Sequence, residues 1–143
     1  MKPEQYAPYL QTLEAAKKDS PIPIYAGLEL DAYSDDDTSI FDYIIASAHY
    51  IIKNGVCYPI DHSPAQQQEC MRDAFGGSIL DMAKCYFDIL GEHVAKVKPL
   101  FVGHFDVITK FSLMPEEEER YRKVAREALA RAIAACPYIE MNT

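Results

Sequence analysis

Apolar residues recur every three or four positions in three parts of the chain, and each such pattern predicts a helix. The first helix spans residues 3–18, the longest spans about 78–97, and the third has an apolar face over residues 121–133. Ser78 suits the N-cap of the long helix. Pro115 and the four glutamates after it are a typical helix start. The face of the third helix comprises Tyr121, Val124, Ala125, Ala128, Leu129, Ala132 and Ile133.

Short apolar runs separate the predicted helices, and they are too brief to be buried helices. They cover residues 22–30, 43–49, 100–103 and 138–142. Strands that alternate with helices pair in parallel through right-handed crossovers. The pattern therefore predicts an α/β chain with a parallel sheet.

A hairpin is predicted between the second and third of these strands. Asn54 and Gly55 both tolerate the positive φ of a type I′ turn, and they separate the apolar runs 50–53 and 56–60. We expect this inserted β-hairpin to lie over the mouth of the preceding strand. A short helix then opens near residue 61 and ends by Gly77.

Composition restricts the class of protein further. With 143 residues and 49% hydrophobic content, the chain is expected to form one domain with its own core. It contains no apolar run long enough for a membrane span or signal peptide. Its net charge of −8 argues against a non-specific nucleic-acid binder. The four cysteines lack metal-finger spacing and are expected to be buried thiols of a cytoplasmic protein. They are Cys57, Cys70, Cys85 and Cys136.

Ionisable side chains follow the apolar runs at Glu29, His49, His104 and Glu140. The carboxyl ends of parallel strands converge, and sites are built there. One carboxylate and two imidazoles suit a divalent ion such as zinc, iron or manganese. A single histidine at a strand end is more often a structural group, so spacing alone leaves both interpretations open.

Other polar residues are weaker candidates. Asp106 and Lys110 follow His104 in a strand-to-helix loop, while Glu140 and Asn142 end the last strand. We expect Glu140, Asn142 and Asp106 to be the candidates for substrate binding, and no residue is assigned as a catalytic acid or base. The acidic run 35–37 is expected to be a solvated turn. The histidines expected at the surface are His62 and His93.

Several stretches in the expected order resemble the polymerase-and-histidinol-phosphatase (PHP) superfamily, and in detail its histidinol-phosphatase branch. The similarity extends over about residues 22–143, and the Gly-His-Phe-Asp stretch at 103–106 makes it specific. The resembling stretches are residues 27–31, 41–50, 58–61, 75–77, 102–106 and 139–143.

The resemblance implies a distorted (β/α)7 barrel that holds three metal ions at its carboxyl-end rim. In that family the glutamate matching Glu29 bridges two ions, and the histidines matching His49 and His104 complete the coordination of one of them. The implied enzyme is a metal-dependent phosphomonoesterase that converts histidinol phosphate and water into histidinol and phosphate in histidine biosynthesis. Its partner would be a small phosphate monoester rather than a nucleic acid or a membrane.

The chain departs from the family at both ends. It contains no His-x-His and no Asp-x-His, the motifs that open and close the family pattern. We therefore expect residues 1–143 to form a single, incomplete PHP-type domain, weak or inactive in isolation, that self-associates through exposed sheet edges. Two alternatives stay open. One is another PHP phosphoesterase, including the polymerase-associated nuclease, against which the negative charge counts; the other is a non-catalytic metal-binding fragment that needs a partner.

Overall fold

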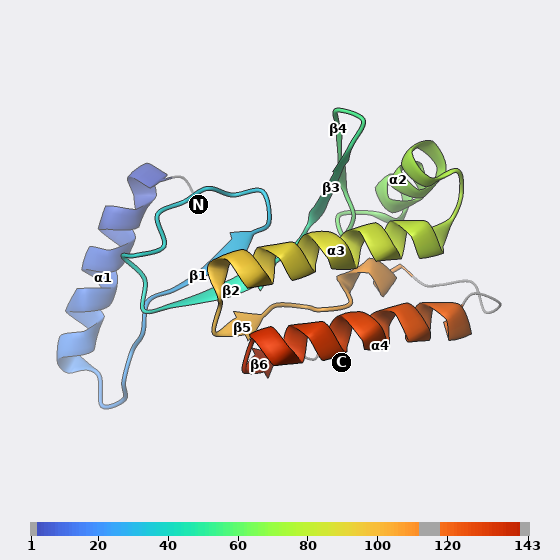
Figure 1. The fold of residues 1–143 in the computed structure, drawn as a ribbon. Coiled ribbons are helices and arrows are strands. Elements are labelled where there is room, and N and C mark those ends of the chain that lie inside the picture. Colours follow the sequence, from blue (N-terminus) through green and yellow to red (C-terminus); the bar gives the residue numbers. More distant parts are fainter. Residues whose placement is uncertain (1–2, 112–117, 141–143) are drawn as a thin grey trace.

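The computed structural model describes residues 3–111 and 118–140. Four α-helices and a four-stranded parallel sheet make up most of this part (Figure 1). The elements in chain order are η1 (Pro3–Gln5), α1 (Tyr6–Asp19), β1 (Gly27–Asp31), β2 (Tyr43–Ser47), β3 (Tyr50–Lys53), β4 (Val56–Pro59), α2 (Pro64–Phe75), α3 (Ile79–Val97), β5 (Phe101–Val102), η2 (Val107–Thr109), α4 (Glu118–Ala135) and β6 (Tyr138–Ile139).

The main sheet has the strand order β1-β2-β5-β6, and every neighbouring pair is parallel. The predicted parallel α/β architecture is therefore confirmed. Within the described residues the sheet is open, with β1 and β6 at its edges. The barrel implied by the family resemblance stays a prediction.

Alternation along the strands gives this sheet two different faces. Leu30, Ala46 and Val102 are almost completely buried and belong to the core. On the other face, Glu29 and Tyr138 are half exposed. This second face carries the polar residues described below.

Helix α3 supplies the largest part of the core. The Ser78 hydroxyl caps it by accepting a hydrogen bond from the backbone N–H of Asp81. Its predicted aromatic residues, Tyr86 and Phe87, are buried. Helix α4 runs beside α3, as Figure 1 shows, and the two are in contact.

The predicted apolar face of α4 is too wide. Tyr121, Ala128 and Ala132 are buried, but Ile133 is 62% exposed. Ile133 lies about 100° around the helix from Ala132, which places it outside the narrow stripe that meets α3. The part of the predicted helix start at residues 115–117 lies outside the described residues.

The hairpin forms as predicted, with φ of 54° at Asn54 and 79° at Gly55. Its inner side chains, Ile51 and Tyr58, are buried, and the hairpin contacts α2 and α3. Figure 1 shows it projecting beyond the main sheet. The hairpin therefore packs on helices α2 and α3.

Two sequence predictions about burial are wrong. His93 is only 5% exposed, and its Nε2 donates a hydrogen bond to the backbone oxygen of Leu30 at 2.9 Å. It follows Leu90 by three residues on α3, so it lies on the buried side of that helix. Cys57 is exposed, whereas Cys70 and Cys136 are buried.

None of the helices in residues 3–111 and 118–140 is long and apolar enough to cross a membrane.

Candidate metal centre

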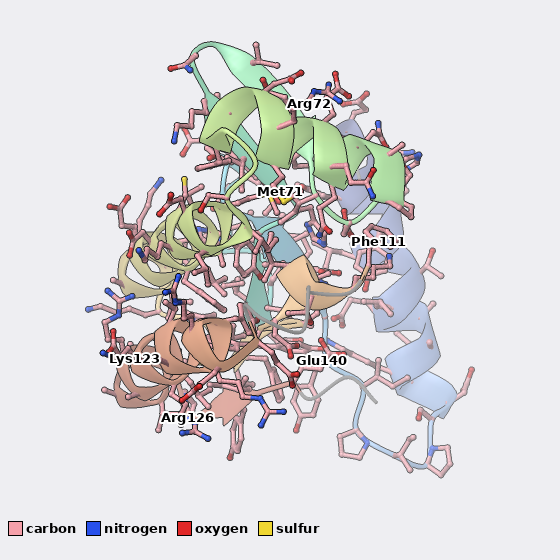
Figure 2. The ribbon with its side chains drawn as sticks, turned by 90° about the vertical axis from the view of Figure 1, so that its right-hand side faces the viewer. Met71, Arg72, Phe111, Lys123, Arg126 and Glu140 are labelled. Carbon is pink, nitrogen blue, oxygen red and sulfur yellow. The ribbon has the colours of Figure 1, made fainter. Side chains whose placement is uncertain are left out.

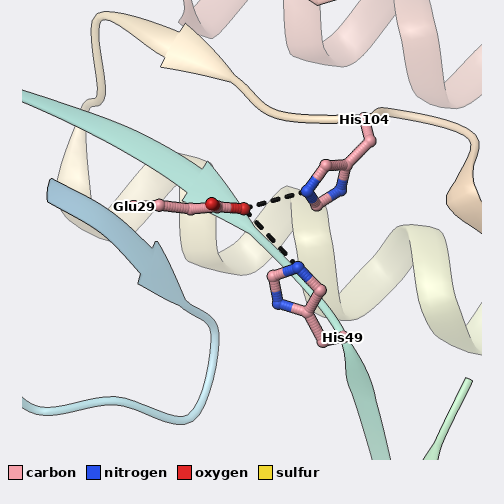
Figure 3. Close-up of side chains that lie close together, drawn as sticks. All are labelled: Glu29, His49 and His104. Atoms are coloured by element: carbon pink, nitrogen blue, oxygen red, sulfur yellow. Dashed lines mark hydrogen bonds and ion pairs between the residues drawn. The ribbon is translucent and has the colours of Figure 1, made fainter. Parts of the chain in front are cut away.

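Glu29, His49 and His104 meet on the second face of the main sheet (Figure 3). Their ligand atoms all lie within 4.8 Å of one another. Glu29 Oε1 is 2.9 Å from His104 Nε2 and 3.5 Å from His49 Nε2. The sequence prediction that these three side chains converge is confirmed.

The chain segments around three parallel strands bring the cluster together. His49 lies two residues after β2, and His104 lies two residues after β5. Glu29 was predicted at a strand end, but β1 continues to Asp31, so Glu29 is the middle residue of a five-residue strand. The longer strand still directs Glu29 to the same face.

Glu29 Oε1 has three polar neighbours, namely the Ser47 hydroxyl, His104 Nε2 and His49 Nε2. This oxygen accepts a hydrogen bond from the hydroxyl of Ser47 at 2.8 Å, in addition to the two histidine contacts. Partial burial raises the pKa of Glu29, but the hydrogen bonds from Ser47 and His104 and the charges of both histidines outweigh burial. The pKa of Glu29 is therefore lowered, and the carboxylate is ionised at neutral pH.

His49 is held from its other side by Asp31. Asp31 Oδ2 lies 3.1 Å from His49 Nδ1 and accepts the backbone N–H of His49 at 2.9 Å. The hydrogen bond to Asp31 raises the pKa of His49, and the charges of Asp61, Asp31 and Glu29 add to this against the effect of burial. Burial alone would raise the pKa of Asp31, but its hydrogen bonds with His49 and Tyr33 lower it.

His104 is positioned through its backbone. Its φ of 25° is positive, an uncommon value for a residue with a side chain. Its backbone N–H donates to Glu140 Oε2 at 2.8 Å, and Figure 2 labels Glu140. The ring Nδ1 of His104 is buried without a hydrogen-bond partner in the described part of the chain.

A hollow of about 400 Å³ adjoins the cluster. Tyr43 and Phe101 pack edge to face with ring centroids 5.9 Å apart. The ring centroids of Phe101 and Tyr138 are 5.3 Å apart, so the three rings form a row. The lining of the hollow therefore combines two carboxylates and one imidazole with the aromatic rings of Tyr43 and Phe101. Its lining residues are Glu29, Tyr43, Ile45, Phe101, His104 and Glu140.

The cluster fits a divalent cation. Ligand atoms about 2.0–2.2 Å from one ion are about 3–3.5 Å from each other. The two distances from Glu29 Oε1, 2.9 Å and 3.5 Å, meet this requirement. The group formed by Glu29, His49 and His104 could therefore hold a metal ion after small side-chain movements.

The remaining predicted candidates lie at different places. Glu140 lines the hollow, whereas Asp106 is exposed before η2 and does not line it. Lys110 Nζ donates to the backbone oxygen of Asp61 at 2.8 Å, and His62 is exposed as predicted. Asn142 lies outside the described residues.

Sequence reasoning missed Asp31 and Ser47. Asp31 follows Glu29 by two residues, and this period places both carboxylates on one face of β1. That signal was present in the sequence. Ser47 is completely buried and gave no comparable signal, because a serine inside an apolar strand is common.

Models of known protein families do not match the chain, and a search of curated proteins finds no match either. The resemblance to the PHP superfamily therefore stays a prediction. What the structure shows is the convergence of Glu29, His49 and His104.

Proposed function

We propose that the chain binds a divalent metal ion through Glu29, His49 and His104 and serves in the hydrolysis of a phosphate monoester. The observation that supports this proposal is the meeting of one carboxylate and two imidazole nitrogens from three separate segments. Zinc, iron and manganese all accept this mixture of nitrogen and oxygen ligands. Histidinol phosphate is the substrate that the sequence resemblance implies.

Charge supports a role for a cation in this hollow. Glu29 and Glu140 both line it, and a phosphate monoester would be repelled by two carboxylates. A bound divalent ion would offset this charge, polarise a phosphate oxygen and lower the pKa of a bound water. Anion binding at this place therefore requires the metal centre.

Other residues of the chain position the ligands and line the hollow. Ser47 holds the Glu29 carboxylate toward the two histidines. Tyr43, Ile45 and Phe101 offer an apolar wall against which the organic part of a substrate can pack and from which it displaces water. Glu140 holds the backbone of His104 and thereby the position of its ring.

We also propose that the four strands belong to a distorted (β/α)7 barrel of the PHP type. Their parallel order and the polar face away from α3 and α4 support this proposal. In such a barrel that face would point to the interior, and further ligands would come from additional strands. The described residues contain one His/Glu ligand group, so we expect weak hydrolysis by this chain alone.

Calorimetric titration with Zn²⁺ and Mn²⁺ tests the metal centre. We expect the 143-residue chain to bind one ion, and Glu29→Gln and His49→Ala to lose more than about 100-fold in affinity, since each removes a direct ligand. His62→Ala, an exposed histidine, is the matched control and is expected to bind as the wild type does. Binding that is unaffected by Glu29→Gln and His49→Ala would refute the site.

Phosphate release from histidinol phosphate tests the activity. We expect metal-dependent turnover far below ~1–10³ s⁻¹, the range of ordinary enzymes. His49→Ala should abolish it and leave the fold intact. Turnover at ordinary enzyme rates would show that one ligand group suffices. Metal binding without any turnover would favour the alternative of a non-catalytic metal-binding protein.

A further inference from the structure

The side chain of Asp31 is fixed by three hydrogen bonds. Its Oδ2 accepts the backbone N–H of His49 at 2.9 Å and faces the ring Nδ1 of the same residue at 3.1 Å. Its Oδ1 accepts the backbone N–H of Tyr33 at 3.0 Å. The side chain is 18% exposed, so few alternative positions are open to it. Asp31 is thus hydrogen-bonded to both the backbone and the ring of His49.

His49 lies between two carboxylates that compete for its hydrogen. Nδ1 is 3.1 Å from Asp31, and Nε2 is 3.5 Å from Glu29. A neutral imidazole carries one N–H, and an ionised carboxylate can only accept. The shorter distance and the better fixed partner favour the hydrogen on Nδ1, which leaves a lone pair on Nε2.

We propose that Asp31 is a positioning residue that keeps the hydrogen of His49 on Nδ1 and so presents Nε2, unprotonated, to the cation. This inference rests on the proposed metal centre. Without Asp31, Glu29 would attract the hydrogen to Nε2, which is the nitrogen that the cation needs. A carboxylate behind a ligating imidazole commonly has this effect on metal binding.

The other histidine of the cluster shows what is lost without such a partner. His104 Nδ1 is buried and has no hydrogen-bond partner in residues 3–111 and 118–140. Its Nε2 lies 2.9 Å from Glu29, which favours a hydrogen on the side facing the cation. Asp31 therefore makes His49 the histidine that is prepared to bind, and His104 must shift its hydrogen first.

The experiment compares three carboxylate-to-amide variants. Asp31→Asn keeps the shape of the side chain but removes one accepting oxygen. Asp61→Asn is the charge control, because Asp61 acts on His49 through its charge. Asp42→Asn is the structural control, since Asp42 accepts the backbone N–H of Ala26 at 2.7 Å away from the cluster. Each variant is titrated with Zn²⁺ by calorimetry.

We expect Asp31→Asn to weaken Zn²⁺ binding by about 10–100-fold. The two controls should change it by less than about threefold, and Asp31→Glu should recover part of the loss. Equal effects of Asp31→Asn and Asp61→Asn would reduce the role of Asp31 to charge and overturn the inference.

A second measurement needs no metal, and its decisive reading comes from the wild type. The ¹⁵N chemical shifts of the His49 ring in the metal-free wild type at alkaline pH report which nitrogen carries the hydrogen, and His49→Ala assigns the signals. We expect Nδ1–H in the wild type and a shift toward Nε2–H in Asp31→Asn. Nε2–H in the wild type would overturn the inference even if Asp31→Asn failed to fold. Wild-type protein that shows Nδ1–H but binds no Zn²⁺ would refute the proposed function instead.

Discussion

The open face of the sheet depends on a single glycine. A Cβ atom at Gly27 would clash with Cζ of Tyr43, because the Tyr43 ring lies against β1 at this position. Tyr43 in turn packs edge to face on Phe101 and lines the hollow beside the cluster. The absence of a side chain at Gly27 therefore allows the Tyr43 ring to take its position in the lining of the hollow.

We expect Gly27→Ala to displace the Tyr43 ring and to lower the free energy of unfolding by about 1–3 kcal/mol, the usual cost of overpacking. Urea denaturation measures this change. In the background of Tyr43→Ala the same substitution should cost much less, since the clash is gone. An equal cost of Gly27→Ala in both backgrounds would show that the ring contact is not its cause.

The cysteines provide a second test at the scale of residues. Burial raises the pKa of the Cys70 thiol to about 11, whereas Cys57 is exposed on β4. Below that pKa the protonated thiol is a poor nucleophile, so Cys70 should resist labelling at neutral pH. Its rate should rise by about tenfold for each pH unit up to the pKa, provided that the fold persists.

Labelling with a disulfide reagent at neutral pH should therefore show one fast thiol, and Cys57→Ser should remove it. Cys70→Ser should leave the fast phase unchanged. A fast phase that survives Cys57→Ser would mean that a buried or half-buried thiol is more accessible than the structure shows.

At the scale of elements, the bounds of long elements could be predicted from the sequence, and those of short elements could not. Nineteen residues of α3 repeat the apolar period often enough to define both ends, with Ser78 as its cap. Strands β5 and β6 have two residues each and are shorter than the predicted strands. The sequence does not distinguish apolar residues that flank a strand from those within it. The parallel pairing was still predictable from the alternation with helices, whereas the strand order β1-β2-β5-β6 comes from the structure.

Sequence patterns identified the candidate metal ligands of the site but not the residues that position them. Polar residues after apolar runs identified His49 and His104, since chain topology brings strand ends together. The spacing of Glu29 and Asp31 indicates a shared face of β1, but the 3.1 Å distance between Asp31 Oδ2 and His49 Nδ1 could only be found from the structure. His93 was misjudged because a histidine that bonds to a buried backbone oxygen has the same sequence context as an exposed one.

The cap of α3 offers a test at this scale. Ser78→Ala removes the acceptor of the Asp81 N–H, and we expect a loss of about 1 kcal/mol in the free energy of unfolding. Ser78→Asp keeps an acceptor and adds a charge that suits the helix N-terminus, so its stability should stay near that of the wild type. Thermal or urea unfolding distinguishes the two. Equal losses would indicate that packing around Ser78, and not capping, is responsible.

At the scale of the whole molecule, the two faces of the sheet differ in how far the described residues cover them. Ala46 and Val102 share one buried cluster with residues of α3 and α4, while Tyr138 on the other face is 56% exposed. Among the described strands, β1 and β6 each pair with one neighbour, which leaves two sheet edges. Unpaired edges and apolar rows are templates for association.

We expect the chain to self-associate through these surfaces, against the repulsion of its net charge of −8. Sedimentation velocity should show a mass that rises with protein concentration. Association should strengthen with salt, because the Debye length falls from about 30 Å at 0.01 M to about 8 Å at 0.15 M and screens the repulsion. A monomer that stays independent of concentration and salt would contradict this prediction.

A pair of substitutions then locates the contact. Tyr138→Lys places a charge in the aromatic row of the open face, and we expect it to weaken association by about tenfold or more. Ile133→Lys makes the same change of charge on the outside of α4, where Ile133 is 62% exposed, and should have little effect. Both variants raise the net charge equally, so repulsion cannot explain a difference between them. If Ile133→Lys were the disruptive one, the copies would meet through α4, and the open face would be free to admit a substrate.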